Sequence, residues 1–108
     1  MFIIILPQIF YKNFRGLAIY PFIFLKSKDL AQNKEILNHE RIHLRQQLEM
    51  LWFFFFIWYG IEFFIHLIRY KDSKKAYFNI SFEREAYRNE SNINYLKTRK
   101  FFAFYSYL

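Results

Sequence analysis

The sequence of 108 residues contains no cysteine and few residues that break regular structure. Without cysteine, disulfide scaffolds, iron–sulfur clusters, thiolate zinc sites and cysteine nucleophiles are excluded, so a metal site has to use His, Asp and Glu. Glycine and proline occur twice each, which leaves no flexible linker to divide the chain. We therefore expect a single domain over residues 1–108.

Aromatic rings and positive charge are abundant instead. Hydrophobic residues make up 55% and aromatic residues 25% of the chain, which excludes a disordered tail. A chain of this length cannot bury so many rings without a membrane or a partner. The formal net charge of +7 favours an anionic membrane surface or nucleic acid. Because the basic residues are scattered and the rings lie in apolar runs, we expect no nucleic-acid partner.

Two apolar segments near the N-terminus predict β-structure. Residues 1–6 (MFIIIL) stop at Pro7 and lack the basic leader and cleavage site of a signal peptide, so we interpret them as a short buried strand or turn. An uncleaved segment that dips into a membrane is the alternative. Residues 17–25, after Gly16, are rich in β-branched and aromatic residues and predict a strand. Pro21 has no N–H to donate, which places this strand at a sheet edge.

The pattern from about residue 33 to Met50 predicts a helix, capped either by Asp29 with Gln32 or by Asn33. Apolar and chemically active side chains repeat every three or four residues on one side, and polar side chains repeat on another. The first set is Ile36, His39, Glu40, His43 and Gln47, and the second is Asn38, Arg41, Arg45 and Glu49. The helix could continue into the next segment, with Gly60 as its weakest point.

Residues 51–68 (LWFFFFIWYGIEFFIHLI) predict a hydrophobic, aromatic-rich helix interrupted by Glu62 and His66. The charge-free part is short for a full membrane crossing, but its Trp and Tyr residues favour the lipid headgroup layer. A buried core helix is the alternative to a helix in or against a bilayer. We expect a membrane-associated protein, and a cytoplasmic one otherwise.

Three further segments complete the chain. Residues 71–75 predict a polar turn, and a helix capped by Asn79 or Ser81 follows it to about Asn89. Residues 93–108 are basic first and aromatic after, which predicts an amphipathic helix that seeks a membrane surface.

Residues 39–43 read HERIH, the H-E-x-x-H pattern, on the expected helix. Positions four apart share a helix face, so His39 and His43 can direct nitrogen atoms at one metal ion. Glu40 lies beside the first histidine and can act as a base without binding the metal. The alternative is a pair of surface histidines beside an acid.

A catalytic zinc site needs a third protein ligand. Glu49 occupies the position of the third His in the longer metzincin pattern, but Gln46 replaces the Gly that turns that chain back, so Glu49 stays too far along the helix. His66 lies in the apolar run, and Glu83 lies on a later predicted helix. Glu85 is the nearest rival of Glu83, and the two point away from each other.

HERIH, then a hydrophobic segment, then E-x-x-A at Glu83 and Ala86 resembles the gluzincin zinc metallopeptidases. The pattern is most similar to their membrane-associated branch, which includes the CAAX prenyl-protein endopeptidases and the antirepressor peptidases. In that family the third zinc ligand is a Glu on a helix after the motif helix. The resemblance covers residues 17 to about 89 and implies that Zn²⁺ is bound by His39, His43 and Glu83.

Tyr87 stands where the family usually has an Asp that orients a ligand histidine. Glu90, Glu62 or Tyr87 itself would have to take that role. Tyr87 is also a candidate donor to the oxyanion. The family binds extended peptide beside an edge strand, which the resemblance assigns to residues 17–25; a plain core strand is the alternative.

Together these features predict a mostly helical α+β fold. A short N-terminal β-hairpin or edge strand would pack on a metal-binding helix pair, with the aromatic-rich helix between the two. We expect a zinc-dependent peptidase in which Glu40 moves a proton from water to the leaving amine. Its partners would be a peptide or protein substrate and a membrane, contacted through residues 51–68 and 93–108. An inactive metallopeptidase-like protein and a basic amphipathic membrane-interaction protein are the alternatives.

Overall fold

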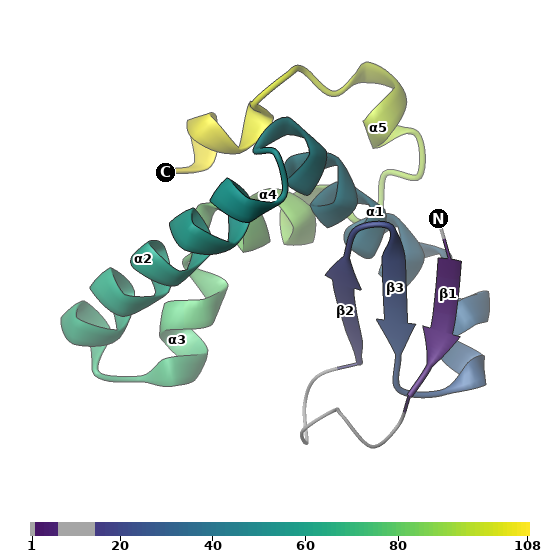
Figure 1. Cartoon of the computed structure of the whole chain (residues 1–108), viewed down its shortest axis with the longest axis horizontal. Coiled ribbons are helices and arrows are strands. Elements are labelled where there is room, and N and C mark those ends of the chain that lie inside the picture. The colour runs from purple at the N-terminus through teal and green to yellow at the C-terminus, as the bar shows by residue number, and fades with distance from the viewer. Residues whose placement is uncertain (1, 7–14) are drawn as a thin grey trace.

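The computed structural model describes residues 2–6 and 15–108 and has a mostly helical α+β fold, as the sequence predicts. A small sheet lies at one end, and the helices α1, α2, α3 and α4 extend from it (Figure 1). In chain order the elements are β1 (Phe2–Ile5), β2 (Gly16–Ile19), β3 (Phe22–Leu25), the 3₁₀ helix η2 (Lys28–Gln32), α1 (Lys34–Glu49), α2 (Phe53–Tyr70), α3 (Ser73–Phe78), α4 (Ser81–Asn89), α5 (Tyr95–Thr98) and the 3₁₀ helix η3 (Ala103–Tyr107).

The strands are arranged in the order β1-β3-β2, with β1 parallel and β2 antiparallel to β3. The single strand predicted over residues 17–25 is therefore wrong, because this segment is a hairpin that turns at Tyr20 and Pro21. Pro21 has no N–H for the ladder, and it lies in the turn rather than within an edge strand. Strand β2 is an edge of the sheet, and α1 packs against it.

Strand β1 confirms the strand predicted near the N-terminus, but the prediction that this strand is buried is wrong. The side chains of Phe2 and Ile3 are 60% and 39% exposed, because β1 forms the opposite edge of the sheet from β2. Met1 and the expected interruption at Pro7 lie outside the described residues.

Asn33 caps helix α1, which confirms the second of the two predicted caps. Its side-chain oxygen accepts hydrogen bonds from the backbone N–H groups of Glu35 and Ile36. The helix ends at Glu49, and the chain reverses through Leu51 and Trp52, which both have positive φ. The prediction that the helix is weakest at Gly60 is therefore wrong. Packing of α2 back against α1 sets this break, and no Gly or Pro marks it.

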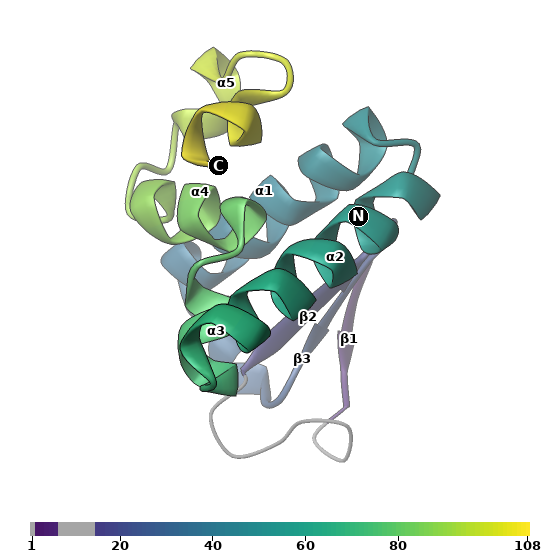
Figure 2. The same cartoon turned by 90° about the vertical axis from the view of Figure 1, so that its left-hand side faces the viewer.

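Helix α2 runs beside α1 (Figure 2). Most of its apolar side chains are exposed. Phe55 is the only residue of α2 that is fully buried. Among the described residues, α2 is the one helix long and apolar enough to cross a membrane. The structure thus supports the hydrophobic helix predicted over residues 51–68, with its start shifted to Phe53.

Two predictions after α2 are wrong. Asp72 caps α3 by accepting hydrogen bonds from the N–H groups of Lys74 and Lys75, so most of the expected turn at 71–75 is helical. Residues 93–108 do not form one amphipathic helix but the short α5 and η3. Phe104 is buried in η3, because it packs on the core rather than facing outward.

Buried apolar residues form two small clusters on either side of α1 and α4. One cluster joins the sheet to α1, and the other joins α2, α4 and η3. Their members are Ala18, Ile23, Leu25 and Leu44 in the first, and Phe55, Ile80, Phe82 and Phe104 in the second. The polar residues that α1 and α4 bury lie between these clusters, and they form the candidate site.

Candidate metal centre

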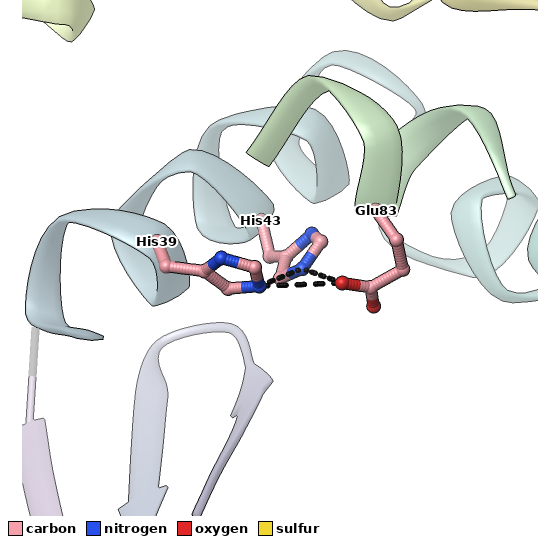
Figure 3. A group of neighbouring side chains, drawn as sticks. All are labelled: His39, His43 and Glu83. Carbon is pink, nitrogen blue, oxygen red and sulfur yellow. Dashed lines mark hydrogen bonds and ion pairs between the residues drawn. The ribbon is translucent and has the colours of Figure 1, made fainter. Parts of the chain in front are cut away.

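Helices α1 and α4 bring His39, His43 and Glu83 together, as Figure 3 shows. The Nε2 atoms of the two histidines are 3.2 Å apart, and the Glu83 Oε1 atom lies 3.2 Å from His39 Nε2 and 3.0 Å from His43 Nε2. All three residues are buried. The two histidines lie one helical turn apart on α1, and Glu83 occupies the first turn of α4, which crosses it.

The triangle formed by these three atoms has the size that zinc requires. Zinc binds nitrogen and oxygen ligands at about 2.0–2.1 Å in tetrahedral sites, which places neighbouring ligand atoms about 3.3 Å apart. The observed separations of 3.0–3.2 Å come close to this value. The three residues are also the only group in the described ranges, 2–6 and 15–108, that could hold a metal ion.

The outer nitrogen of each histidine is already used. His39 Nδ1 donates to the Glu90 Oε1 atom at 2.9 Å, and His43 Nδ1 donates to the Gln46 Oε1 atom at 2.8 Å. When each histidine is neutral with its hydrogen on Nδ1, both Nε2 atoms keep an unshared electron pair. Those electron pairs point toward the carboxylate of Glu83, and metal ligation needs this tautomer.

Gln46 belongs to the candidate site, a role that the sequence did not predict. Its Nε2 group donates to the Phe82 carbonyl oxygen at 3.2 Å and to the Glu85 Oε1 atom at 2.9 Å, which fixes its own oxygen toward His43. The available signal was its position three residues after His43 on the same helix.

Of the three residues expected to orient a ligand histidine, Glu90 holds this position. Glu62 lies elsewhere and accepts hydrogen bonds from the N–H and hydroxyl groups of Ser81 at the start of α4. The Tyr87 ring packs against His39 with the ring centres 4.4 Å apart, and its hydroxyl is 3.1 Å from that of Tyr77. Tyr87 therefore touches a ligand histidine without bonding to its nitrogens.

Helix α2 also contributes to the centre. The Tyr59 hydroxyl donates to the Glu83 Oε2 atom at 2.8 Å, which leaves Oε1 for the histidines. No local pattern in the sequence marks Tyr59, because the contact depends on how α2 folds back.

The acids and histidines change one another's pKa. Burial lowers the pKa of His39, but the hydrogen bonds to Glu83 and Glu90 outweigh it and raise that pKa to about 10. For Glu83, burial raises the pKa, and the two histidines outweigh it and hold the pKa well below its usual range. Burial raises the pKa of Glu40 above its usual value, which makes its carboxylate a stronger base.

Glu40 lies next to His39, 7% exposed, and borders a cavity of about 710 Å³. Within residues 2–6 and 15–108, no group donates a hydrogen bond to its carboxylate. Gly16 of β2 lies against it, and a Cβ atom there would be 2.9 Å from the Glu40 Oε2 atom. The carboxylate is thus held beside the cavity and is available for a substrate.

The same cavity is lined by all three candidate ligands, by the start of β2 and by aromatic rings of α2 and α3. Gln47 of α1 donates to the Ala18 carbonyl oxygen and accepts from the Tyr20 N–H, both at 2.7 Å. Alternate residues of a strand direct their backbone groups to the same edge, so the N–H and C=O of Gly16 lie on this edge, away from β3.

The rival ligands are engaged elsewhere. Glu85 is fully buried and pairs with Arg99, which also binds Glu49. His66 lies 3.8 Å from Glu62 on α2. Within the part of the chain that the structure describes, none of the three rivals forms a hydrogen bond with the histidine pair.

No protein-family model, curated protein or solved structure matches this chain. The function therefore has to be inferred from the residues and distances of the candidate site.

Proposed function

We propose that the protein is a zinc-dependent peptidase with His39, His43 and Glu83 as metal ligands. One observation carries the proposal: the two histidine Nε2 atoms and Glu83 Oε1 lie within 3.2 Å of one another, and both Nδ1 atoms have acceptors of their own. Two N–H groups 3.2 Å apart would face each other, so at most one of the two Nε2 atoms can carry a proton without repulsion. One divalent cation satisfies all three atoms together. Two His and one Glu form a catalytic zinc set with a fourth position left for water.

A zinc ion held by His39, His43 and Glu83 would supply Lewis acidity toward water and a peptide carbonyl. Glu40 would accept a proton from water on its carboxylate and deliver it to the leaving amine, for which its raised pKa is suited. Glu90 and Gln46 keep the hydrogen of each histidine on Nδ1. The Tyr87 hydroxyl, which borders the cavity, is the candidate donor to the developing oxyanion.

The substrate is an extended peptide that lies along the edge of β2. The backbone N–H and C=O of Gly16 face that edge beside Glu40, and a strand added there would place its own backbone next to the histidines. Gln47 already occupies the edge from Ala18 to Tyr20, which limits the added strand to the end of β2 nearer the metal ligands.

The test is to express the full chain and measure bound zinc by elemental analysis and hydrolysis of a peptide library. We expect about one zinc per chain in the wild type, loss of zinc in Glu83→Ala, and zinc without hydrolysis in Glu40→Gln. His66→Ala is the matched control that removes the third histidine and should change neither quantity. Zinc that survives Glu83→Ala, or hydrolysis that survives Glu40→Gln, would contradict the proposed ligand or the proposed base.

The alternative is a metal-binding protein without hydrolytic activity. It is favoured by the replacement of the family Asp by Tyr87 and by the small size of the chain, which provides little remote binding energy. Zinc uptake by the wild type with no hydrolysis of any library peptide would select it.

We also propose that the protein associates with a membrane through α2. Its exposed residues include Ile61, Phe64 and Ile68, at 56%, 64% and 75%, on a helix that ends among basic residues at Arg69 and Lys71. An exposed apolar face of this size marks a membrane or protein contact, and the basic residues favour anionic lipid. This surface also supports the second alternative, a basic amphipathic membrane-interaction protein. Vesicle binding without any bound zinc would select that alternative.

A further inference from the structure

The C-terminal segment places a buried arginine beneath the candidate metal centre. The guanidinium of Arg99 donates from Nε to Glu85 Oε2 at 2.5 Å, from Nη2 to Glu85 Oε1 at 3.1 Å and from Nη1 to Glu49 Oε2 at 2.6 Å. The side chains of Arg99 and Glu85 are 0% exposed and that of Glu49 is 3% exposed. Removing one partner of such a group leaves an uncompensated charge, so its members depend on one another.

This cluster is connected to the ligand histidine by directed hydrogen bonds. Glu85 Oε1 accepts from Gln46 Nε2 at 2.9 Å, and Gln46 Oε1 accepts from His43 Nδ1 at 2.8 Å. A carboxylate accepts hydrogen bonds and donates none, so Gln46 has to direct its NH₂ group toward Glu85 and its carbonyl toward His43. The direction of each bond is therefore set from the Glu85 end.

We propose that Arg99 is a positioning residue of the metal centre: it holds the Glu85 carboxylate, which fixes the Gln46 amide and thereby the hydrogen on His43 Nδ1. The inference rests on the proposed metal site and assigns the C-terminal segment a role in it. A reversed Gln46 amide would present its NH₂ group to Nδ1 and require the hydrogen on Nε2, the atom that binds metal. Arg99 acts through two other side chains and touches neither metal nor substrate.

A second contact limits the expected size of the effect. Gln46 Nε2 also donates to the Phe82 carbonyl oxygen at 3.2 Å, which favours the same amide orientation without Arg99. Outer residues that orient a ligand histidine typically contribute 10- to 100-fold to metal affinity. Because Arg99 lies two steps beyond the Gln46 contact with His43, we expect Arg99→Met to weaken zinc binding about 10-fold, at the lower end of this range.

The test measures the zinc Kd of the full chain by competition with a chromogenic chelator. Arg99→Met should weaken zinc binding, and Arg99→Lys should weaken it less, because a lysine keeps the charge but cannot bind both acids with a planar fork. Lys97→Met is the matched control, since it removes a positive charge from an exposed position two residues earlier and should leave the zinc Kd unchanged. Phe104→Ala, which removes a buried ring of the same segment, calibrates the effect of lost stability alone.

A double-mutant cycle with Gln46→Met separates positioning from general stability. If Arg99 acts through Gln46, adding Arg99→Met to Gln46→Met weakens zinc binding little further. Additive losses, or an equal loss in Phe104→Ala, would overturn the inference. If Arg99→Met does not fold, Arg99→Lys and Gln46→Met decide the question. A wild-type chain that binds no zinc contradicts the proposed function, whereas a wild type that binds zinc with an unchanged Kd in Arg99→Lys and Arg99→Met contradicts only the positioning role.

Discussion

Helices α1 and α2 lie side by side (Figure 2). Together they reverse the usual distribution of polar and apolar residues. Six of the eight residues that α1 buries are polar or charged, whereas α2 buries one ring and exposes most of its apolar side chains. Buried polar groups and exposed apolar patches are the informative exceptions in a folded protein. The buried polar residues of α1 mark a candidate site, and the exposed apolar face of α2 beside it marks a candidate contact surface.

The polar residues of α1 are stable in the interior because almost all of them have partners. Asn38 donates to the carbonyl oxygens of Asn89, Glu90 and Asn92, and Gln47 binds two backbone groups at the end of β2. A buried polar group without a partner costs about 1–3 kcal/mol, so this pairing is required. Most of the apolar side chains of α2 have no corresponding burial within the described part of the chain.

The largest expected effect concerns the polar site of α1: removal of the metal should lower the thermal stability of the protein. A ligand present at about 1,000 times its Kd stabilises the native state by about 4 kcal/mol. In a domain of this size that corresponds to a thermal midpoint about 15 °C lower after a chelator is added. Calorimetry with and without chelator checks the expectation, and Glu83→Ala should show no response to chelator. A wild-type thermal midpoint that does not change when chelator is added would contradict the proposed metal site.

Charges placed on the outer face of α2 should have the next largest effect. The double variant Ile61→Glu with Phe64→Glu should weaken binding to vesicles that contain anionic lipid about 100-fold. Each side chain contributes about 1.5–3 kcal/mol when buried in lipid, and the new carboxylates are repelled by the headgroups. Cosedimentation with vesicles measures the loss, and zinc content should stay unchanged.

Arg84→Glu on α4 is the control for that experiment, because it changes the net charge by the same two units at an exposed position outside α2. Equal losses of vesicle binding in Arg84→Glu and in the α2 variant would assign the binding to net charge alone. The apolar face of α2 would then need another partner.

The pH dependence of stability should differ in sign between the metal-free and the zinc-bound protein. The folded pKa of His39, about 10, lies above its unfolded value of 6.5, so its contribution is complete below pH 6.5 and is lost as the pH rises toward 10. The lowered pKa of Glu83 adds stability above its unfolded value of 4.5 and loses it as the pH falls. The metal-free protein should therefore be most stable between about pH 4.5 and 6.5.

Zinc competes with protons for the same nitrogen atoms, so the stability added by zinc should grow as the pH rises through this region. Urea unfolding at pH 6 and pH 9, with zinc and with chelator, measures both trends. A metal-free protein that becomes more stable from pH 6.5 to 9.5 would contradict the assigned histidine environment.

The sequence predicted the parts of the site that depend on local spacing. His39, Glu40 and His43 lie within five residues, and helical periodicity alone places the histidines on one face. Glu83 lies on another helix, and its contact with the histidines follows from packing of α4 on α1. A resemblance to known peptidases was needed to select it over His66.

The other contacts of the site depend on tertiary packing, which no local sequence pattern predicts. Arg99 was assigned to an amphipathic helix that does not exist, and its contacts come from far along the chain. The break at Leu51 and Trp52 contains neither Gly nor Pro, and it follows from the packing of Phe55 in the core. Tyr59 reaches Glu83 only because of this reversal.

The smallest expected effect tests how closely the sheet fits against α1. In Gly16→Ala, the new Cβ atom would lie 2.9 Å from Glu40 Oε2 and 3.3 Å from Glu40 Cδ, so the carboxylate has to move by a few tenths of an ångström. Gly16 does not have a positive φ, so alanine adds no backbone strain there. We expect kcat/KM to fall about 10-fold, because misplacement of a catalytic group by about 1 Å can cost 100-fold. Zinc content should stay unchanged.

Gly60→Ala is the matched substitution on α2, where the added Cβ atom meets nothing within 4 Å. It should leave kcat/KM unchanged and stabilise the helix by up to about 1 kcal/mol, since alanine has the higher helix propensity. Steady-state kinetics and thermal unfolding of the two variants measure both quantities. If Gly16→Ala lowered stability but not kcat/KM, the contact between β2 and Glu40 would serve packing alone, and β2 would have no part in holding the base.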